Sequence, residues 1–142
     1  WKSVMERKGI TEEVAVKRVD VANKAFPDAM VKNYGGLIPN LTLPDHKDCH
    51  VLAAAIKTNA NIIVTNNLKD FPGHYLDSFG IKAKSADDFL TDIIDLNQDQ
   101  AVAAFKEMVL NKRNPELDEY EVLDLLRNCG LNETANYLHA FL

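Results

Sequence analysis

The chain has 142 residues, of which 46% are hydrophobic and 26% are charged, and its formal net charge is −5. This length is enough for one domain with a buried core, and the composition is ordinary for a soluble globular protein. No apolar run approaches the roughly 20 residues of a membrane-spanning helix, which argues against a membrane protein.

The charge is unevenly distributed along the chain. Residues 1–43 carry seven basic and five acidic side chains, whereas residues 44–142 carry nine basic and sixteen acidic ones. Surfaces that follow a nucleic-acid backbone are usually basic, so a general nucleic-acid coat is disfavoured. A metal-dependent site escapes this objection, because its carboxylates hold cations that then face phosphate. The two cysteines, Cys49 and Cys129, fit a reduced, cytoplasmic protein.

The N-terminal third is predicted to be helical and then irregular. Residues 1–8 resemble the end of a helix that Gly9 terminates, and the Trp at position 1 instead of Met indicates a trimmed chain. Thr11 is expected to cap a second helix, which Pro27 stops. Residues 29–31 are a candidate short strand, and residues 34–40 are predicted to form a loop.

The central stretch, Leu43–Pro72, predicts a helix, a tight loop, a strand and a polar exit loop. Asp45 is a good N-cap, and Asp48 falls in the first helical turn, where the helix dipole favours a carboxylate. Ile62–Val64 is a continuous β-branched run, which is typical of a parallel strand buried on both faces. Because ligands bind at the carboxyl ends of such strands, the polar residues that follow are candidates for a site.

The remainder of the chain predicts an edge strand and then helices. Ile81–Lys84 alternates apolar residues with lysines, which discourage further pairing. Ser85 is expected to cap a helix over Ala86–Leu96, with acids in its first turn. A helical tail then follows: a helix capped by Asn97, a helix through Val122–Cys129 ended by Gly130, and a helix over Asn132–Leu142.

Four side chains of the central stretch are candidates for chemistry: Asp48, Thr65, Asn67 and Asp70. Asp48 is either a first-turn charge or a ligand of Mg²⁺, which prefers oxygen ligands. Thr65 and Asn67 either form a turn or position a water or a phosphate. Asp70 is either a loop charge or a further acid of the cluster. Carboxylates about 4 Å apart repel by about 4 kcal/mol at an effective dielectric near 20, so clustering them needs a cation or a raised pKa.

A zinc site is a weaker interpretation of the same region. His46 and His50 are spaced i, i+4, as in part of a zinc site. Lys47 stands where a zinc metalloprotease motif needs Glu, and no third ligand is evident, so the sequence disfavours catalytic zinc.

The motif PDHKDCHVLAAAI, followed by IIVTNNLKDFP, resembles the second half of a PIN domain. It is most similar to a bacterial subgroup in which a helical tail follows, like VLDLLRNCGL here. The resemblance implies a three-layer α/β/α PIN-like domain with a parallel sheet over residues 1–96 and a helical tail over residues 97–142. Many PIN proteins are VapC-type toxins, which are Mg²⁺-dependent ribonucleases neutralised by a bound antitoxin.

The resemblance also implies roles for the four candidates. Asp48 would be a ligand of Mg²⁺ or Mn²⁺, Asn67 and Asp70 auxiliary ligands or water positioners, and Thr65 a hydroxyl donor. Asn67 stands where the family has an acid, and the family's acids on a first strand and an early helix have no counterpart after Trp1. We therefore expect an N-terminally truncated, inactive fragment of a toxin-type ribonuclease, with RNA as substrate and an antitoxin as partner.

Two other functions stay open at this point. One is a non-catalytic PIN-like binding module whose helical tail holds a protein partner, which the neutral Asn67 favours. The other is a structural fragment that forms a homodimer to bury its free strand edge. Dependence on a divalent metal separates the first of these from a ribonuclease, and the oligomeric state tests the second.

Overall fold

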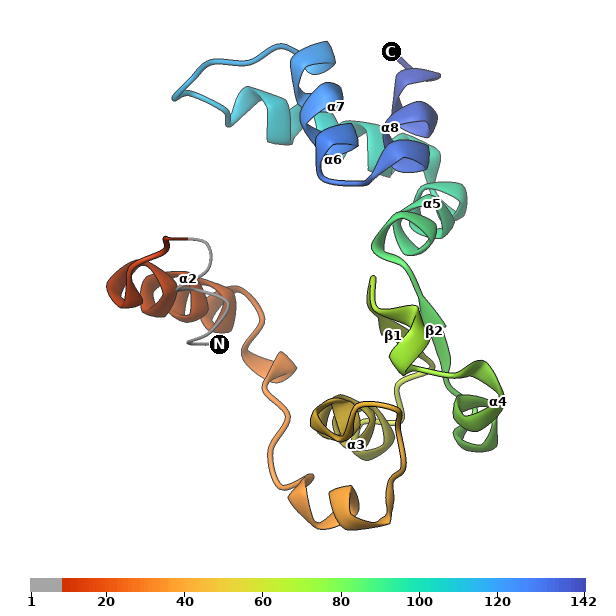
Figure 1. Ribbon diagram of the computed structural model, residues 1–142. Helices are drawn as coiled ribbons and strands as arrows, with labels where there is room; N and C mark the ends of the chain where they lie inside the picture. Colours follow the sequence, from red (N-terminus) through yellow and green to blue (C-terminus); the bar gives the residue numbers. More distant parts are fainter. Residues whose placement is uncertain (1–8) are drawn as a thin grey trace.

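The computed structural model describes residues 9–142, so the helix end predicted within residues 1–8 lies outside the described residues. The fold is mixed α/β, mostly helical, with a small parallel sheet formed by β1 (Ile62–Val64) and β2 (Lys82–Lys84). The helices are α2 (Glu12–Ala25), α3 (Cys49–Lys57), α4 (Gly73–Leu76), α5 (Ala86–Leu96), α6 (Gln98–Leu110), α7 (Glu119–Asn128) and α8 (Asn132–His139) (Figure 1). None of these helices is both long enough and apolar enough to cross a bilayer.

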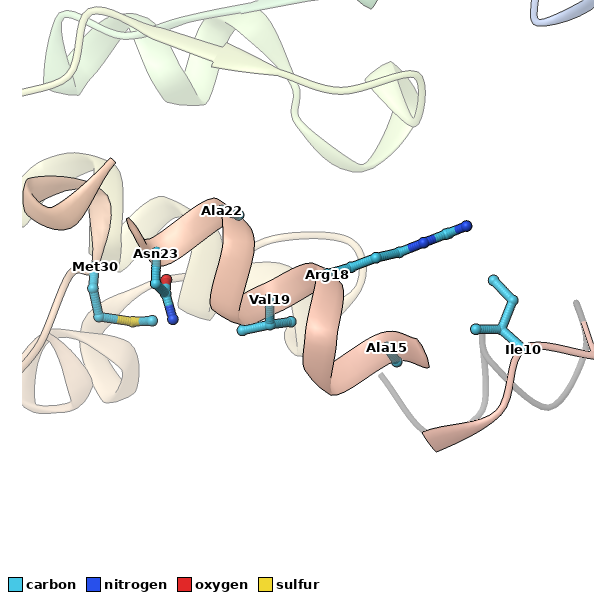
Figure 2. Close-up of a pocket in the computed structure, with 7 residues that line it drawn as sticks. All are labelled: Ile10, Ala15, Arg18, Val19, Ala22, Asn23 and Met30. Carbon is cyan, nitrogen blue, oxygen red and sulfur yellow. The ribbon is translucent and has the colours of Figure 1, made fainter. Parts of the chain in front are cut away.

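Helix α2 begins at the predicted cap but buries little of its apolar side. The Thr11 hydroxyl accepts a hydrogen bond from the Val14 N–H at 3.4 Å, and the main contacts of the helix are with the turn that follows it. Val16 and Val21 are 54% and 60% exposed. A hollow along the helix is lined by residues of α2 and its flanks and by none of the four candidate residues (Figure 2).

The predicted strand over residues 29–31 is wrong. Pro27–Ala29 form a 3₁₀ turn, and Met30, although extended, belongs to neither strand. Pro27 presets a turn conformation. The predicted loop over residues 34–40 is more regular than expected, because Gly35–Asn40 form a 3₁₀ helix.

One hydrophobic core gathers around α3 and joins it to β1 and α4. Its fully buried residues are Cys49, Leu52, Ala53 and Leu76. Ala53 and Ala55 of α3 are buried in this core, so small side chains lie where the helix packs against its neighbours. Cys49 and Cys129 are both free thiols, the first buried and the second exposed.

Strand β1 is parallel to β2, as predicted, but it is not buried on both faces. Its residues pair in register with Lys82–Lys84. Ile63 is 5% exposed and lies in the core, whereas Ile62 and Val64 are 37% and 45% exposed. Successive side chains of a strand point to opposite faces, so only one face of this sheet is covered by the described residues.

A second core joins α5 to the three helices of the tail. It consists of Ile94, Phe105, Val109, Val122, Leu123, Ala135 and Leu138. The predicted caps are confirmed: Ser85 accepts from the Asp88 N–H and Asn97 from the Gln100 N–H, both at 3.1 Å. Because Ile94 lies in this second core and the α5 N-terminus follows β2 directly, α5 connects the sheet to the tail (Figure 1).

Candidate functional site

Asp48 lies where a short 3₁₀ turn, His46–Asp48, runs into α3. Asp45 caps this turn by accepting a hydrogen bond from the Lys47 N–H at 2.9 Å. The sequence predicts one continuous helix with Asp48 in its first turn; instead Asp48 occupies the N-cap position of α3 and makes no capping hydrogen bond there. Its carboxylate is therefore free to interact outside its own helix.

The exit loop of β1 is folded by local hydrogen bonds. The Thr65 N–H donates to the Lys84 carbonyl at 2.8 Å and so extends the parallel ladder by one residue. The Asn67 N–H donates to the Thr65 hydroxyl at 3.1 Å, and the Asp70 N–H donates to the Asn67 carbonyl at 3.2 Å. These bonds bring the side chains of Asn67 and Asp70 to the same side of the loop.

Asp48, Asn67 and Asp70 meet at the carboxyl end of β1, as the sequence predicts. The Asn67 side-chain N–H₂ group donates to Oδ2 of Asp48 at 3.5 Å and also to Oδ2 of Asp70. Thr65 lies beside this cluster, and in this structure its hydroxyl accepts from the Asn67 backbone N–H instead of bonding to either carboxylate. Asp48 and Asp70 are half-buried and Asn67 is exposed, so the cluster is open to a ligand from solvent.

The donor set of this cluster fits a hard divalent cation. Its ligating atoms are carboxylate and amide oxygens, and Mg²⁺ is commonly held by one or two carboxylates together with waters and substrate phosphates. The Asn67 N–H₂ group lies between two anions, where it offsets part of their repulsion. Rotation of the same carboxamide by half a turn would present its oxygen to a cation instead, because the amide carries both a donor and an acceptor.

No zinc-type arrangement accompanies this cluster. Among residues 9–142, no three His, Cys, Asp or Glu side chains lie together in a way that could hold a metal ion. His46 and His50 gain no third ligand of these types within the described part of the chain.

Asn66 is a residue of this loop for which the sequence analysis assigned no role. Its Oδ1 atom accepts a hydrogen bond from the Ala86 N–H at 3.2 Å, at the start of α5. The signal for this contact is weak in the sequence, because the partner lies 20 positions further along the chain. A local cap, by contrast, has its partner two or three residues away.

Comparisons with known proteins agree with the resemblance read from the central motif. Residues 86–140 match the family model described as the VapC50 C-terminal domain. A curated protein of Mycobacterium tuberculosis (strain ATCC 25618 / H37Rv), named "Putative ribonuclease VapC50", is 43% identical over 81 residues, which are 57% of this chain and 48% of that protein. The match thus spans about half the length of this relative. No solved structure gives a significant match to the chain. These two matches support the resemblance of the chain to the VapC-type PIN-domain family.

Proposed function

We propose that this protein is a metal-dependent ribonuclease of the toxin type, with its site at the cluster of Asp48, Asn67 and Asp70. The observation that carries the proposal is the convergence of these three side chains at the carboxyl end of β1, although Asn67 lies 19 residues after Asp48 in the chain. The relative from Mycobacterium tuberculosis, which is named as a ribonuclease, supports the same reaction class.

The proposal includes the architecture and the partners implied by the family. The complete protein would form a three-layer α/β/α domain, of which residues 1–96 supply a part, with residues 97–142 as a helical tail. RNA would be the substrate, an antitoxin protein the inhibitor, and the cytoplasm the compartment. The exposed Ile62 and Val64 on one face of β1 leave room for the further layer that this architecture requires.

In the proposed site, Asp48 and Asp70 hold Mg²⁺ or Mn²⁺ and Asn67 supplies an amide oxygen or orients a water. Thr65 fixes the Asn67 backbone through the hydrogen bond to its hydroxyl. When bound, the cation supplies Lewis-acid stabilisation of the charge that develops on a phosphate oxygen. The half-buried carboxylates favour a cation over a neutral ligand, because each loses part of its hydration at this position.

We further propose that residues 1–142 alone cleave RNA poorly. The cluster contains two carboxylates and one neutral amide, and the family pattern places an acid where Asn67 stands. Incubation of the chain with structured RNA and Mg²⁺ or Mn²⁺, with an EDTA control, tests this proposal. Rapid cleavage that EDTA abolishes would contradict it.

A non-catalytic binding module is the second candidate, and a specific contact favours it. The Asn67 amide already donates to both carboxylates, so part of their mutual repulsion is offset without a cation. Isothermal titration calorimetry, which measures the heat of Mn²⁺ binding to the chain, separates the two candidates. A ribonuclease site is expected to bind Mn²⁺ through Asp48, whereas heat changes identical in the parent and in Asp48→Asn would favour the binding module.

A further inference from the structure

Asn66 and Asn67 are neighbours in the chain, yet their side chains serve different parts of the fold. The Asn67 amide donates to Asp48 and Asp70, whereas the Asn66 side-chain oxygen accepts from the Ala86 N–H at 3.2 Å. Asn66 lies in a bend, and Asn67 has φ −96° and ψ 54°, outside the helical and extended regions. The hydrogen bond of the Asn66 side chain thus holds this bend at the start of α5, one residue before the side chain that bonds to the carboxylates.

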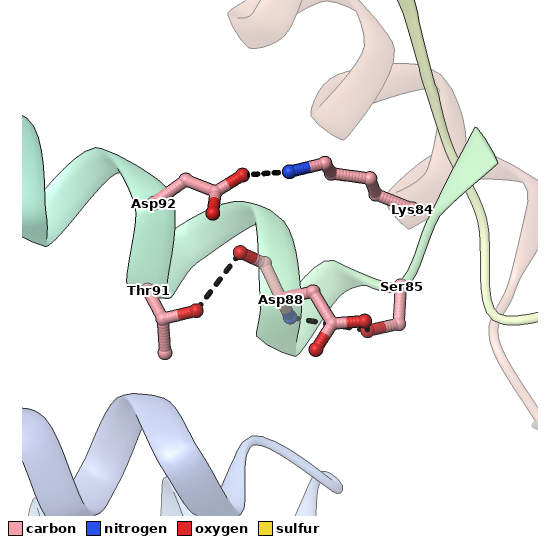
Figure 3. A network of polar contacts seen from close by, with 5 residues as sticks. All are labelled: Lys84, Ser85, Asp88, Thr91 and Asp92. Carbon is pink, nitrogen blue, oxygen red and sulfur yellow. Dashed lines mark hydrogen bonds and ion pairs between the residues drawn. The ribbon is translucent and has the colours of Figure 1, made fainter. Parts of the chain in front are cut away.

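The start of α5, to which the Asn66 side chain bonds, is itself held by several hydrogen bonds. Ala86 is the first residue of α5, and its N–H is one of the groups at a helix start that have no partner within the helix. Ser85 caps the same helix by accepting from the Asp88 N–H at 3.1 Å, and its hydroxyl donates to the Asp88 carboxylate at 2.7 Å. Figure 3 shows this network together with the ion pair between Lys84 and Asp92, which ties the end of β2 to α5.

The exit loop is thus attached to the segment that joins β2 to α5, through two consecutive residues. Thr65 bonds through its backbone to Lys84, and Asn66 bonds through its side chain to Ala86. The first bond is part of the sheet ladder and does not depend on the side chain at position 65. The second depends entirely on the carboxamide of Asn66. The Thr65 hydroxyl holds the Asn67 backbone within the loop, whereas the Asn66 side chain attaches the loop to α5.

We propose that Asn66 is a positioning residue: by binding the start of α5, it orients Asn67 toward Asp48 and Asp70 and so sets the affinity of the site for a divalent cation. The cation affinity rests on the proposed function, whereas the orientation of Asn67 does not. The Asn66 side chain bonds to Ala86 and to neither carboxylate, so its effect on the site is indirect.

The test compares Asn66→Ala with a matched control, Asn97→Ala. Asn97 accepts from a backbone N–H at the start of α6 at 3.1 Å, so both variants remove one side-chain acceptor from a helix start. Two readouts are recorded: the side-chain amide resonances of Asn67 in metal-free protein, and the Mn²⁺ affinity by calorimetry. Asn66→Ala is expected to shift the Asn67 resonances and to weaken Mn²⁺ binding roughly fivefold or more, whereas Asn97→Ala leaves both near the parent values.

A second variant breaks the same hydrogen bond from the opposite side. Ala86→Pro removes the donor N–H without altering the exit loop, and proline is favoured at the first position of a helix. It is expected to reproduce the effect of Asn66→Ala, and the double variant is expected to add little to either single one, because both remove the same interaction. If Asn66→Ala does not fold, Ala86→Pro alone decides the question.

The possible outcomes separate this proposal from the proposed function. Unchanged Asn67 resonances in both Asn66→Ala and Ala86→Pro would overturn the positioning role, whether or not the parent binds Mn²⁺. If the two variants shift the Asn67 resonances but the parent binds no Mn²⁺, the positioning of Asn67 is supported and the metal site is contradicted. Equal losses of Mn²⁺ affinity in Asn66→Ala and Asn97→Ala would assign the effect to general stability and would also overturn the proposal.

Discussion

The carboxylate of Asp87 caps the start of α8, 47 residues further along the chain, through Thr134. Oδ1 of Asp87 accepts from the Thr134 hydroxyl at 2.7 Å and from the Thr134 N–H at 2.8 Å, and Oδ2 accepts from the Glu133 N–H at 2.9 Å. Thr134 is 4% exposed, so its polar groups depend on this carboxylate rather than on water. One side chain of α5 thereby fastens the last helix of the tail.

Removal of this carboxylate is expected to destabilise the tail. Asp87→Ala leaves the buried Thr134 hydroxyl and two N–H groups at the start of α8 without their acceptor, at a cost of about 1–3 kcal/mol in the free energy of unfolding. Urea denaturation followed by circular dichroism measures the cost. Asp88→Ala is the control, because Asp88 is exposed and its carboxylate accepts only from the neighbouring Ser85 hydroxyl in this structure. Equal losses of unfolding free energy in Asp87→Ala and Asp88→Ala would contradict the role given to Asp87.

The same contact predicts a pH dependence of stability. Burial raises the pKa of Asp87, but the hydrogen bonds from the Thr134 hydroxyl and from the backbone of Thr134, Glu133 and Asn132 outweigh it, so the pKa lies below the usual 3.8. A lowered pKa in the folded state means that the contribution is present above the unfolded pKa and is lost as the pH falls through the folded one. Asp87→Asn should therefore flatten the decline of the unfolding midpoint below about pH 4, where an unperturbed Asp titrates. Identical declines in the parent and in Asp87→Asn would show that Asp87 does not contribute to it.

Asp48 and Asp45 form a matched pair for testing the metal site in the complete protein. Asp48→Asn is expected to abolish metal-dependent RNA cleavage, because it removes a proposed ligand charge, while costing only about 0.3–1 kcal/mol of stability. Asp45→Asn keeps a side chain that caps equally well, so cleavage should change little. Cleavage rates and thermal midpoints are measured for both variants. Normal cleavage by Asp48→Asn, or a larger loss in Asp45→Asn, would show that the ligand is misassigned.

Asn67→Asp is expected to lower the stability of the metal-free protein and to raise its affinity for a divalent cation. A third carboxylate would replace the amide that donates to Asp48 and Asp70, so like charges would repel where a hydrogen-bond donor now lies. The thermal midpoint should fall in EDTA, and saturating Mn²⁺ should raise it more than it raises that of the parent. Thermal scans of both proteins with and without Mn²⁺ measure this difference. An Mn²⁺ response no larger than that of the parent would argue against a cation at this cluster.

Much of the local structure was predictable because its causes lie within a few residues. The caps at Thr11, Ser85 and Asn97 each bond an N–H three positions away, and the helix over Ala86–Leu96 has the predicted bounds. The β-branched run Ile62–Val64 is a parallel strand as expected. The convergence of Asp48 with Asn67 was also predictable, since a helix start and the end of the following parallel strand lie on the same side of an αβ unit.

The contacts that the sequence did not reveal join residues far apart in the chain. Asp87 looks like an ordinary first-turn acid, and only the packing of α8 against α5 makes it the cap of another helix. From the sequence Asn66 is an ordinary turn residue, and only the tertiary structure places the start of α5 within hydrogen-bond distance of its side chain. The exposure of Ile62 and Val64 has the same origin, because burial depends on which elements cover a face, whereas a β-branched run specifies only that a strand forms.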